Sequence, residues 1–261
     1  MRPRAAHPSP LERPMANPVV EALEKAVQHA WDLDIPLNEK LTIVANEVRS
    51  LSTLFAEAVD RMVIRLQNTG AGDTAPNVGD VMPPFVLPDE RGRLVALEDL
   101  LAQGPVAISF NRGHWCPYCR LNVHALADLQ KEMSEEGRQL VAIVPERRKF
   151  TAALKAEADA PFPVLTDMDN GYALSLNLAI WVGAEMESLI AGAGWDVPAY
   201  QGNAAWMLPI PATFVVGADG VITARYLDPD YRKRMEIDTL RDALRATYSS
   251  RQKASRRRAT G

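Results

Sequence analysis

The chain has 261 residues, 47% of them hydrophobic, and a formal net charge of −4 at pH 7. This length and apolar content allow one complete core with a smaller appended unit. The mildly acidic balance gives no case for nucleic-acid binding, and no apolar stretch approaches the roughly 20 residues that a membrane-spanning helix needs.

The first part of the chain begins with a proline-rich segment and a short helix. Residues 1–16 contain four prolines together with basic residues, so we expect them to be disordered. Residues 1–18 lack the apolar middle of a signal peptide, and we therefore expect a cytoplasmic protein. Asn17 and Pro18 are typical of a helix start and predict a helix over residues 18–31.

A longer helical pattern follows. From Asn38 to about Gln67, apolar residues recur every three or four positions, which predicts one long amphipathic helix. Its apolar seam can pack against residues 18–31, or against the same helix of a second subunit in a homodimer. No catalytic constellation of side chains occurs in it. Residues 68–78 are rich in Gly, Asn and Thr and are predicted to be a linker.

Strand and helix patterns alternate through the rest of the chain, which predicts an α/β domain with a mostly parallel, helix-covered sheet. The predicted elements are a strand over 106–110, a helix from 117, a strand over 140–144, a helix over 147–158, a strand over 162–167, a helix over 172–176, a hairpin of 213–216 with 221–226, and a helix over about 236–248. Residues 177–209 hold three of the five tryptophans and do not resolve into elements. They form either the wall of a substrate groove or core packing under a long loop.

The two cysteines of the chain, Cys116 and Cys119, lie in the stretch 112–120, directly after the strand at 106–110. With Cys116 at the N-cap and Pro117 in the first turn, the Cys116 sulfur faces the free amides of the helix start, which favour a thiolate. Cys116 is then the nucleophile, and Cys119, one turn later, can release a product as a disulfide. Three neighbours can add positive charge: Arg112, His114 and Arg120.

Other interpretations of the Cys-x-x-Cys spacing explain less of its surroundings. A structural zinc site needs four ligands, and the chain has no second cysteine pair and no histidines at ligand spacing. Two inert buried cysteines do not account for the strand before the pair and the helix after it. Trp115 and Tyr118 would give the pair an apolar rim. The motif therefore predicts redox chemistry at this turn without naming the substrate.

Residues 115–119, Trp-Cys-Pro-Tyr-Cys, resemble the active-site turn of the thioredoxin superfamily, and Cys-Pro-Tyr-Cys is the form typical of glutaredoxins. The frame resembles peroxiredoxin-like proteins of the alkyl hydroperoxide reductase and thiol-specific antioxidant (AhpC/TSA) family, with residues 79–100 similar to its opening and 211–222 to its closing hairpin. This implies a thioredoxin-like, peroxiredoxin-type fold with a central mixed sheet covered by helices. The chain then has five parts: a disordered start (1–16), a helical arm (17–67), a linker (68–78), a redox domain (79–248) and a basic, disordered tail (249–261).

The chain also departs from this family. Peroxiredoxins place a Thr three residues before the peroxide-attacking Cys, a Pro seven before it, and an Arg just ahead of a late strand. In that register Cys119 is the attacking residue and Cys116 replaces the Thr. Arg112 replaces the Pro, and Pro211 stands where the Arg would be. Pro211 instead matches the cis-proline that thioredoxins set beside their cysteines, with an ordinary strand-starting proline as the alternative. The thioredoxin register assigns the attack to Cys116.

These observations predict a thiol-dependent antioxidant oxidoreductase. It would reduce hydroperoxides through a dithiol–disulfide cycle of Cys116 and Cys119, as a thioredoxin-dependent peroxidase with thioredoxin or glutathione as external reductant. No phosphate-binding fingerprint or paired ligand cluster points to a nucleotide, flavin or metal cofactor. One alternative is a protein disulfide reductase without peroxidase activity, which the changes at Cys116 and Pro211 favour. The other is a redox-sensing interaction protein whose arm binds a partner in one oxidation state.

Overall fold

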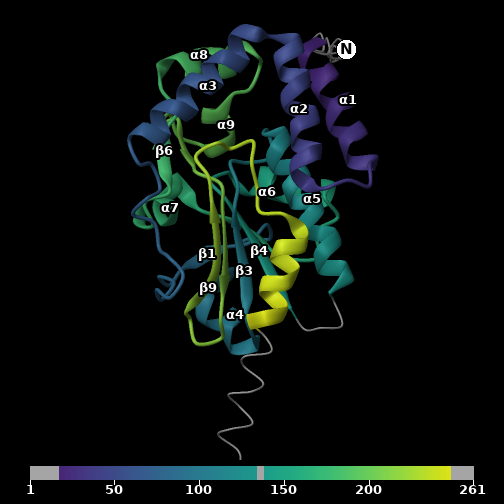
Figure 1. The fold of residues 1–261 in the computed structure, drawn as a ribbon. Coiled ribbons are helices and arrows are strands. Elements are labelled where there is room, and N and C mark those ends of the chain that lie inside the picture. Colours follow the sequence, from purple (N-terminus) through teal and green to yellow (C-terminus); the bar gives the residue numbers. More distant parts are fainter. Residues whose placement is uncertain (1–17, 134–137, 248–261) are drawn as a thin grey trace, which may run out of the picture.

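The computed structural model describes residues 18–133 and 138–247, and a five-stranded sheet with the order β5-β4-β3-β8-β9 lies at its centre (Figure 1). Strands β3 (Val106–Phe110), β4 (Gln139–Val144) and β5 (Val164–Thr166) are parallel, whereas β8 (Ala212–Val216) and β9 (Ile222–Leu227) run antiparallel to their neighbours. The sheet is therefore mixed. The predicted disordered segments, 1–16 and 249–261, lie outside the described residues.

Helices cover both faces of this sheet because successive strand residues point to opposite sides. Ile108 and Phe110 belong to the core on one face and Ala107 to the core on the other. The first face is covered by the hairpin of β1 (Val86–Pro88) and β2 (Leu94–Ala96) and by helices α4 (Leu97–Gln103) and α7 (Gly171–Ser175). The second is covered by α5 (Pro117–Glu132), α6 (Arg148–Glu157) and the helical segment over 237–247.

The N-terminal arm contains three helices instead of the two that the sequence predicts: α1 (Pro18–Asp32), α2 (Leu37–Leu51) and α3 (Thr53–Asn68). The prediction of one helix from Asn38 to Gln67 is wrong. Ser52 adopts an extended conformation (φ −155°), and its hydroxyl accepts a hydrogen bond from the Phe55 amide at 3.1 Å. Ser52 thus ends α2 and caps the start of α3, where its hydroxyl satisfies a free amide.

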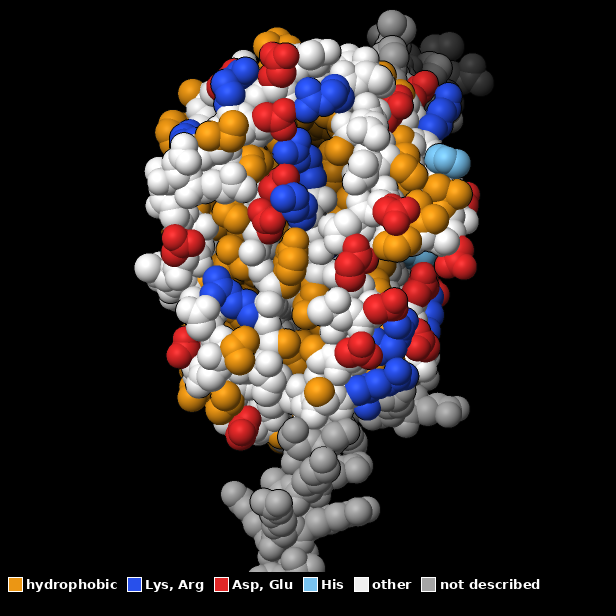
Figure 2. Space-filling model, viewed as in Figure 1, with side chains coloured by type: hydrophobic (Ala, Val, Ile, Leu, Met, Phe, Trp, Pro, Cys, Tyr) orange, Lys and Arg blue, Asp and Glu red, His pale blue; other side chains and the backbone are white. Residues whose placement is uncertain are grey.

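The apolar seam of the arm packs within the chain, because α2 contacts α1 as well as α5. A hydrophobic cluster separate from the cores on the two faces of the sheet joins the arm to Cys116, Cys119 and helix α8 (Ala184–Gly192). Ion pairs add to this contact, among them Asp60–Arg232 at 2.7 Å. In the view of Figure 2, basic and acidic side chains lie side by side along a line in the upper half of the molecule, where Figure 1 places the arm. Whether the chain also forms a homodimer stays a prediction.

The tryptophan-rich segment that the sequence left unassigned folds into short elements beside the arm. They are β6 (Ala179–Trp181), α8 (Ala184–Gly192), α9 (Val197–Gln201) and β7 (Met207–Pro209), preceded by the 3₁₀ turn η2 (Met168–Asn170). Strands β6 and β7 pair antiparallel, and α8 packs on α3. Among the described residues, no helix is long and apolar enough to cross a membrane.

The Ser52 cap makes a testable contribution to stability. We expect Ser52→Ala to lower the free energy of unfolding by about 1 kcal/mol, because the start of α3 loses a partner for a free amide. Urea unfolding followed by circular dichroism measures this change. Ser50→Ala is the matched control, since its exposed hydroxyl bonds only the Glu47 carbonyl. An equal loss of stability in both variants would contradict a capping role for Ser52.

Candidate active site

The cysteine motif lies where the sequence predicts it, between the end of β3 and the start of α5. Cys116 is the N-cap residue of α5 and Pro117 occupies its first turn. The Cys116 carbonyl accepts hydrogen bonds from the amides of Cys119 and Arg120 at 3.0 and 3.1 Å. Both cysteines are free thiols, and they are only 1% and 0% exposed. The pair is therefore positioned by the helix start but closed off from solvent.

The surroundings of the pair favour a negative charge on Cys119 over one on Cys116. Its Sγ accepts a hydrogen bond from the Arg112 amide at 3.2 Å and from the Arg234 guanidinium at 3.4 Å. Burial by itself would raise the pKa of Cys119, but the hydrogen bond from Cys116 and the charges of Arg234 and Arg112 outweigh it and lower that pKa. Burial raises the pKa of Cys116 well above its usual range, and the charge of Cys119 adds to this effect.

This arrangement corrects the expectation that the helix start makes Cys116 the thiolate. The Cys116 side chain makes no capping hydrogen bond to α5. Without that bond, the amides of the helix start do not offset the cost of burying a charge on its sulfur. Cys119 instead receives two donors, so it is the better site for the charge. Cys116, hydrogen-bonded to it, keeps the proton.

The cations around the motif have different roles from those expected. The Arg112 guanidinium is buried and stacks on the rings of Tyr231 and Trp115, 3.8 and 5.1 Å from their centroids. His114 and Arg120 contact Glu157 instead of the sulfurs, at 2.7 and 2.6 Å. Arg120 also pairs with an acidic side chain of α1, Glu24, at 2.6 Å. Its charge thus joins the arm to α5, and the expectation that it supports a thiolate is wrong.

Two residues of the site escaped the sequence analysis, and Arg234 is the first. It comes from the loop between β9 and the helical segment over 237–247, and it is 3% exposed. It lies 115 positions from Cys119, so no local pattern connects the two. The sequence feature that could have indicated Arg234 was the run of charged residues after the last strand, from Asp228 to Arg234. Arg234 supplies a guanidinium to the pair although Pro211 stands where peroxiredoxins place their Arg.

Glu146 is the second residue of the site that the sequence analysis missed. It follows β4, and its Oε2 accepts the His114 amide at 2.7 Å, whereas its Oε1 has no hydrogen-bond partner among the described residues. Burial raises the pKa of Glu146 to about 8, with the charge of Cys119 acting in the same direction and hydrogen bonds from the His114 and Trp115 amides opposing it. A Cβ on Gly113 (φ +136°) would lie 2.5 Å from this carboxyl, so glycine is required there.

The aromatic residues of the motif are buried beneath the arm instead of forming a surface rim. Trp115, Pro117 and Tyr118 line a cavity of about 20 Å³ that reaches Cys116, and the other lining residues are Val48, Phe55, Arg112, Ile190, Trp195 and Tyr231. This volume holds about one water-sized group. A mostly apolar groove of about 410 Å³ shares Val48, Phe55 and Trp195 with the cavity. The segment over 177–209 therefore contributes a wall of the site.

Pro211 lies between β7 and β8, one residue before Ala212, which pairs with Phe110 at the end of β3. No peptide bond among the described residues is cis, so the expected cis-proline is wrong. Pro211 does not line the cavity at Cys116. It matches the alternative, a proline that directly precedes a strand. In residues 18–133 and 138–247, no group of three or more His, Cys, Asp or Glu side chains is placed to hold a metal ion.

Comparison with known proteins agrees with this fold. The model of the AhpC/TSA family matches residues 78–225. The chain is 23% identical over 171 residues to the 1-Cys peroxiredoxin PER1 of Hordeum vulgare, covering 63% of this chain and 70% of that protein. It is 31% identical over 100 residues to the thiol-disulfide oxidoreductase ResA of Bacillus subtilis, covering 38% of this chain and 55% of that protein.

A solved structure gives the same result for the fold. Peroxidoxin BcpB from Mycobacterium tuberculosis superposes with a TM-score of 0.50 at 22% identity, and the match covers 65% of this chain and 96% of that one. The arm and the loop that carries Arg234 lie outside the residues matched by the family model. The match nonetheless spans more than half of the chain and includes the cysteine motif. The chain therefore belongs to the AhpC/TSA family, and it is an oxidoreductase with a thioredoxin-like, peroxiredoxin-type fold.

Proposed function

We propose that the chain reduces hydroperoxides through a cycle in which Cys116 and Cys119 pass from dithiol to disulfide. One observation carries the proposal: a buried cysteine pair with one stabilised negative charge adjoins a cavity that admits only a group of about the size of a peroxide. Thioredoxin or glutathione in the cytoplasm would return the two electrons. This makes the enzyme a thiol peroxidase with an antioxidant role.

In the first step Cys116 attacks the peroxide, because its sulfur lines the cavity and that of Cys119 does not. Cys119 acts as the base: the Cys116 proton moves to it along the hydrogen bond between the two sulfurs. The Cys116 sulfur then bonds to one peroxide oxygen and the O–O bond breaks. The products are a sulfenic acid on Cys116 and an alkoxide, or hydroxide from hydrogen peroxide, which takes the proton from Cys119.

In the second step the Cys119 thiolate attacks the sulfenic sulfur and forms the Cys116–Cys119 disulfide. The hydroxide that leaves needs a proton. Glu146 supports this step, because its raised pKa keeps the carboxyl protonated near pH 7 and it lies directly beneath the active-site turn. Transfer of that proton gives water and leaves Glu146 as a carboxylate. One hydroperoxide is thus reduced to an alcohol and water, while the Cys116 thiol and the Cys119 thiolate together lose two electrons.

The disulfide reductase alternative keeps one supporting observation, the Cys-x-x-Cys spacing on a thioredoxin-like fold. Its difficulty is access. A protein substrate pairs in an extended conformation beside the attacking sulfur, and here Val48 and Phe55 of the arm cover that position. A small hydroperoxide needs no displacement of the arm. The redox-sensing alternative has no observation of its own that favours it over the peroxidase.

The single-cysteine variants test the assignment of roles. We expect Cys116→Ser to abolish oxidation by hydrogen peroxide. Cys119→Ser should accumulate a sulfenic acid on Cys116, formed about a hundredfold more slowly because the base is missing. Dimedone trapping with mass spectrometry identifies the modified residue. Rapid reduction of insulin disulfides by the wild-type protein, with no peroxide turnover, would exclude the peroxidase and support the disulfide reductase.

The raised pKa of Glu146 predicts that the free energy of unfolding depends on pH. Its folded-state pKa of about 8 exceeds the usual 4.5, so between these values the folded chain keeps a proton that the unfolded chain has lost. Its contribution to the free energy of unfolding is therefore complete below about pH 4.5 and is lost as pH rises to about 8, on the order of 1.4 kcal/mol per pH unit. The lowered pKa of Cys119 acts in the opposite direction, with stability gained as pH rises.

Glu146→Gln separates the two contributions, since the amide does not titrate and Cys119 is present in both proteins. Urea unfolding at several pH values should show the stability of wild type falling relative to the variant from pH 5 to 8. The variant should also form the disulfide more slowly, without an inflection near pH 8. A constant stability difference across this range would show that Glu146 titrates normally.

A further inference from the structure

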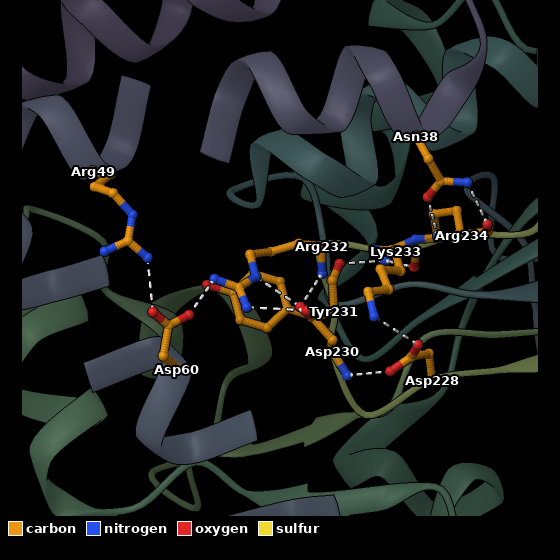
Figure 3. Close-up of polar contacts among 9 residues, drawn as sticks. All are labelled: Asn38, Arg49, Asp60, Asp228, Asp230, Tyr231, Arg232, Lys233 and Arg234. Atoms are coloured by element: carbon orange, nitrogen blue, oxygen red, sulfur yellow. Dashed lines mark hydrogen bonds and ion pairs between the residues drawn. The ribbon is translucent and has the colours of Figure 1, made fainter. Parts of the chain in front are cut away.

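Asn38, at the start of α2, connects the N-terminal arm to the loop that carries Arg234 (Figure 3). Its Oδ1 accepts the Arg234 amide at 2.9 Å, and its Nδ2 donates to the Arg234 carbonyl at 2.8 Å. One side chain therefore fixes both backbone groups of a residue 196 positions away. Such a two-point contact determines the position of the backbone more closely than a single hydrogen bond.

Asn38 is itself held in place by Glu236 of the same loop. The Glu236 carboxylate accepts the amides of Leu37 and Asn38 at 3.0 and 3.1 Å, and the Asn38 Nδ2 at 2.6 Å. Pro36, the N-cap residue of α2, makes no side-chain cap. Glu236 thus satisfies the free amides of α2 and places a negative charge at the positive end of its dipole. The helix start and the loop form one hydrogen-bonded unit.

The side chain of Arg234 extends from this unit to the cysteine pair. Its Nη2 lies 3.4 Å from the Cys119 sulfur, and its Nη1 donates to the carbonyls of Tyr231 and Lys233 in its own loop. Its Nε has no hydrogen-bond partner among the described residues. The position of the guanidinium therefore depends on where the loop backbone lies. A buried charge interacts more weakly as its distance grows, so a displaced loop weakens the contact with Cys119.

We propose that Asn38 is a positioning residue of the active site: by fixing the backbone of Arg234, it keeps the guanidinium against Cys119 and so maintains the negative charge of the cysteine pair. Asn38 and Arg234 both lie outside residues 78–225, so the arm completes a site that the family-matched segment leaves without this cation. The inference rests on the proposed thiol chemistry but not on the identity of the oxidant.

A simpler role for Asn38 would be to hold the arm on the domain, and Asp60 provides the comparison. Asp60 of α3 bonds Arg232 of the same loop and Arg49 of α2, both at 2.7 Å (Figure 3). It joins the arm to the loop two residues from Arg234, and its polar contacts within residues 18–133 and 138–247 include neither Cys119 nor Arg234. If attachment of the arm were all that mattered, Asp60→Asn would affect the cysteine pair as Asn38→Ala does.

The test is a pH titration of the reduced protein, with the thiolate followed by ultraviolet absorbance. The groups that face Cys119 are Cys116 and Arg112 from the turn, Glu146 after β4 and Arg234. Asn38→Ala substitutes none of these residues and removes only the two hydrogen bonds that hold the backbone of Arg234 and the one to Glu236. We expect it to raise the thiolate midpoint by about one pH unit, a tenfold change in the equilibrium. Asp60→Asn should leave the midpoint unchanged.

A double variant shows whether Asn38 acts through Arg234. Arg234→Met should raise the midpoint, and adding Asn38→Ala to it should change little more, because the two act on one contact. If Asn38→Ala does not fold, Glu236→Gln, which keeps the shape of the carboxylate, weakens the same unit and should shift the midpoint in the same direction. An unchanged midpoint in Asn38→Ala, equal shifts in Asn38→Ala and Asp60→Asn, or additive shifts in the double variant would each overturn the proposal.

This titration needs no turnover, so it separates the two proposals. A shifted midpoint in a protein that reduces no hydroperoxide would uphold the role of Asn38 and exclude the peroxidase. Peroxide turnover with an unshifted midpoint would uphold the peroxidase and exclude the role of Asn38.

Discussion

Stabilising a negative charge on the buried sulfur of Cys119 is the constraint on which the active site depends. Moving a charged group out of water costs several kcal/mol unless partners compensate it. Here the compensation comes from two buried guanidinium groups and one backbone amide. Those cations need partners as well: Arg112 has the faces of Tyr231 and Trp115, and Arg234 has two backbone carbonyls. The turn and the loop after β9 thus both supply groups that stabilise this charge.

The arm acts on this charge in two ways. Its apolar side chains, Val48 and Phe55 among them, enclose the sulfur of Cys116 and exclude water, which strengthens the electrostatic interactions around the pair. Asn38, at the start of α2, holds the backbone of the loop that carries Arg234. The arm is therefore more than packing for the redox domain. This explains why a segment outside the family-matched residues shares one hydrophobic cluster with the cysteines.

Sequence patterns predict the parts of this site that neighbours along the chain determine. The strand β3, the start of α5 and the place of Cys116 at its N-cap all follow from adjacent residues. The break at Ser52 does not, since serine is tolerated inside helices and the apolar spacing continues through it. Arg234 and Glu146 could not be found in this way, because chain topology alone brings them to the turn. The cis-proline at Pro211 was transferred from another family and fails here.

The sequence leaves open whether the motif is aligned with peroxiredoxins or with thioredoxins, and each alignment accounts for one of the two cysteines. The hydrogen bonds and buried cations favour a charge on Cys119, as the peroxiredoxin register requires, whereas the cavity opens at Cys116, as the thioredoxin register requires. A single cysteine would have to be both charged and accessible, and an accessible thiolate would lose the dry, cation-lined surroundings that stabilise it. Dividing the tasks removes this conflict. In the proposed cycle, Cys119 keeps the charge in the interior, and one proton transfer from Cys116 to Cys119 brings the charge to the sulfur that lines the cavity.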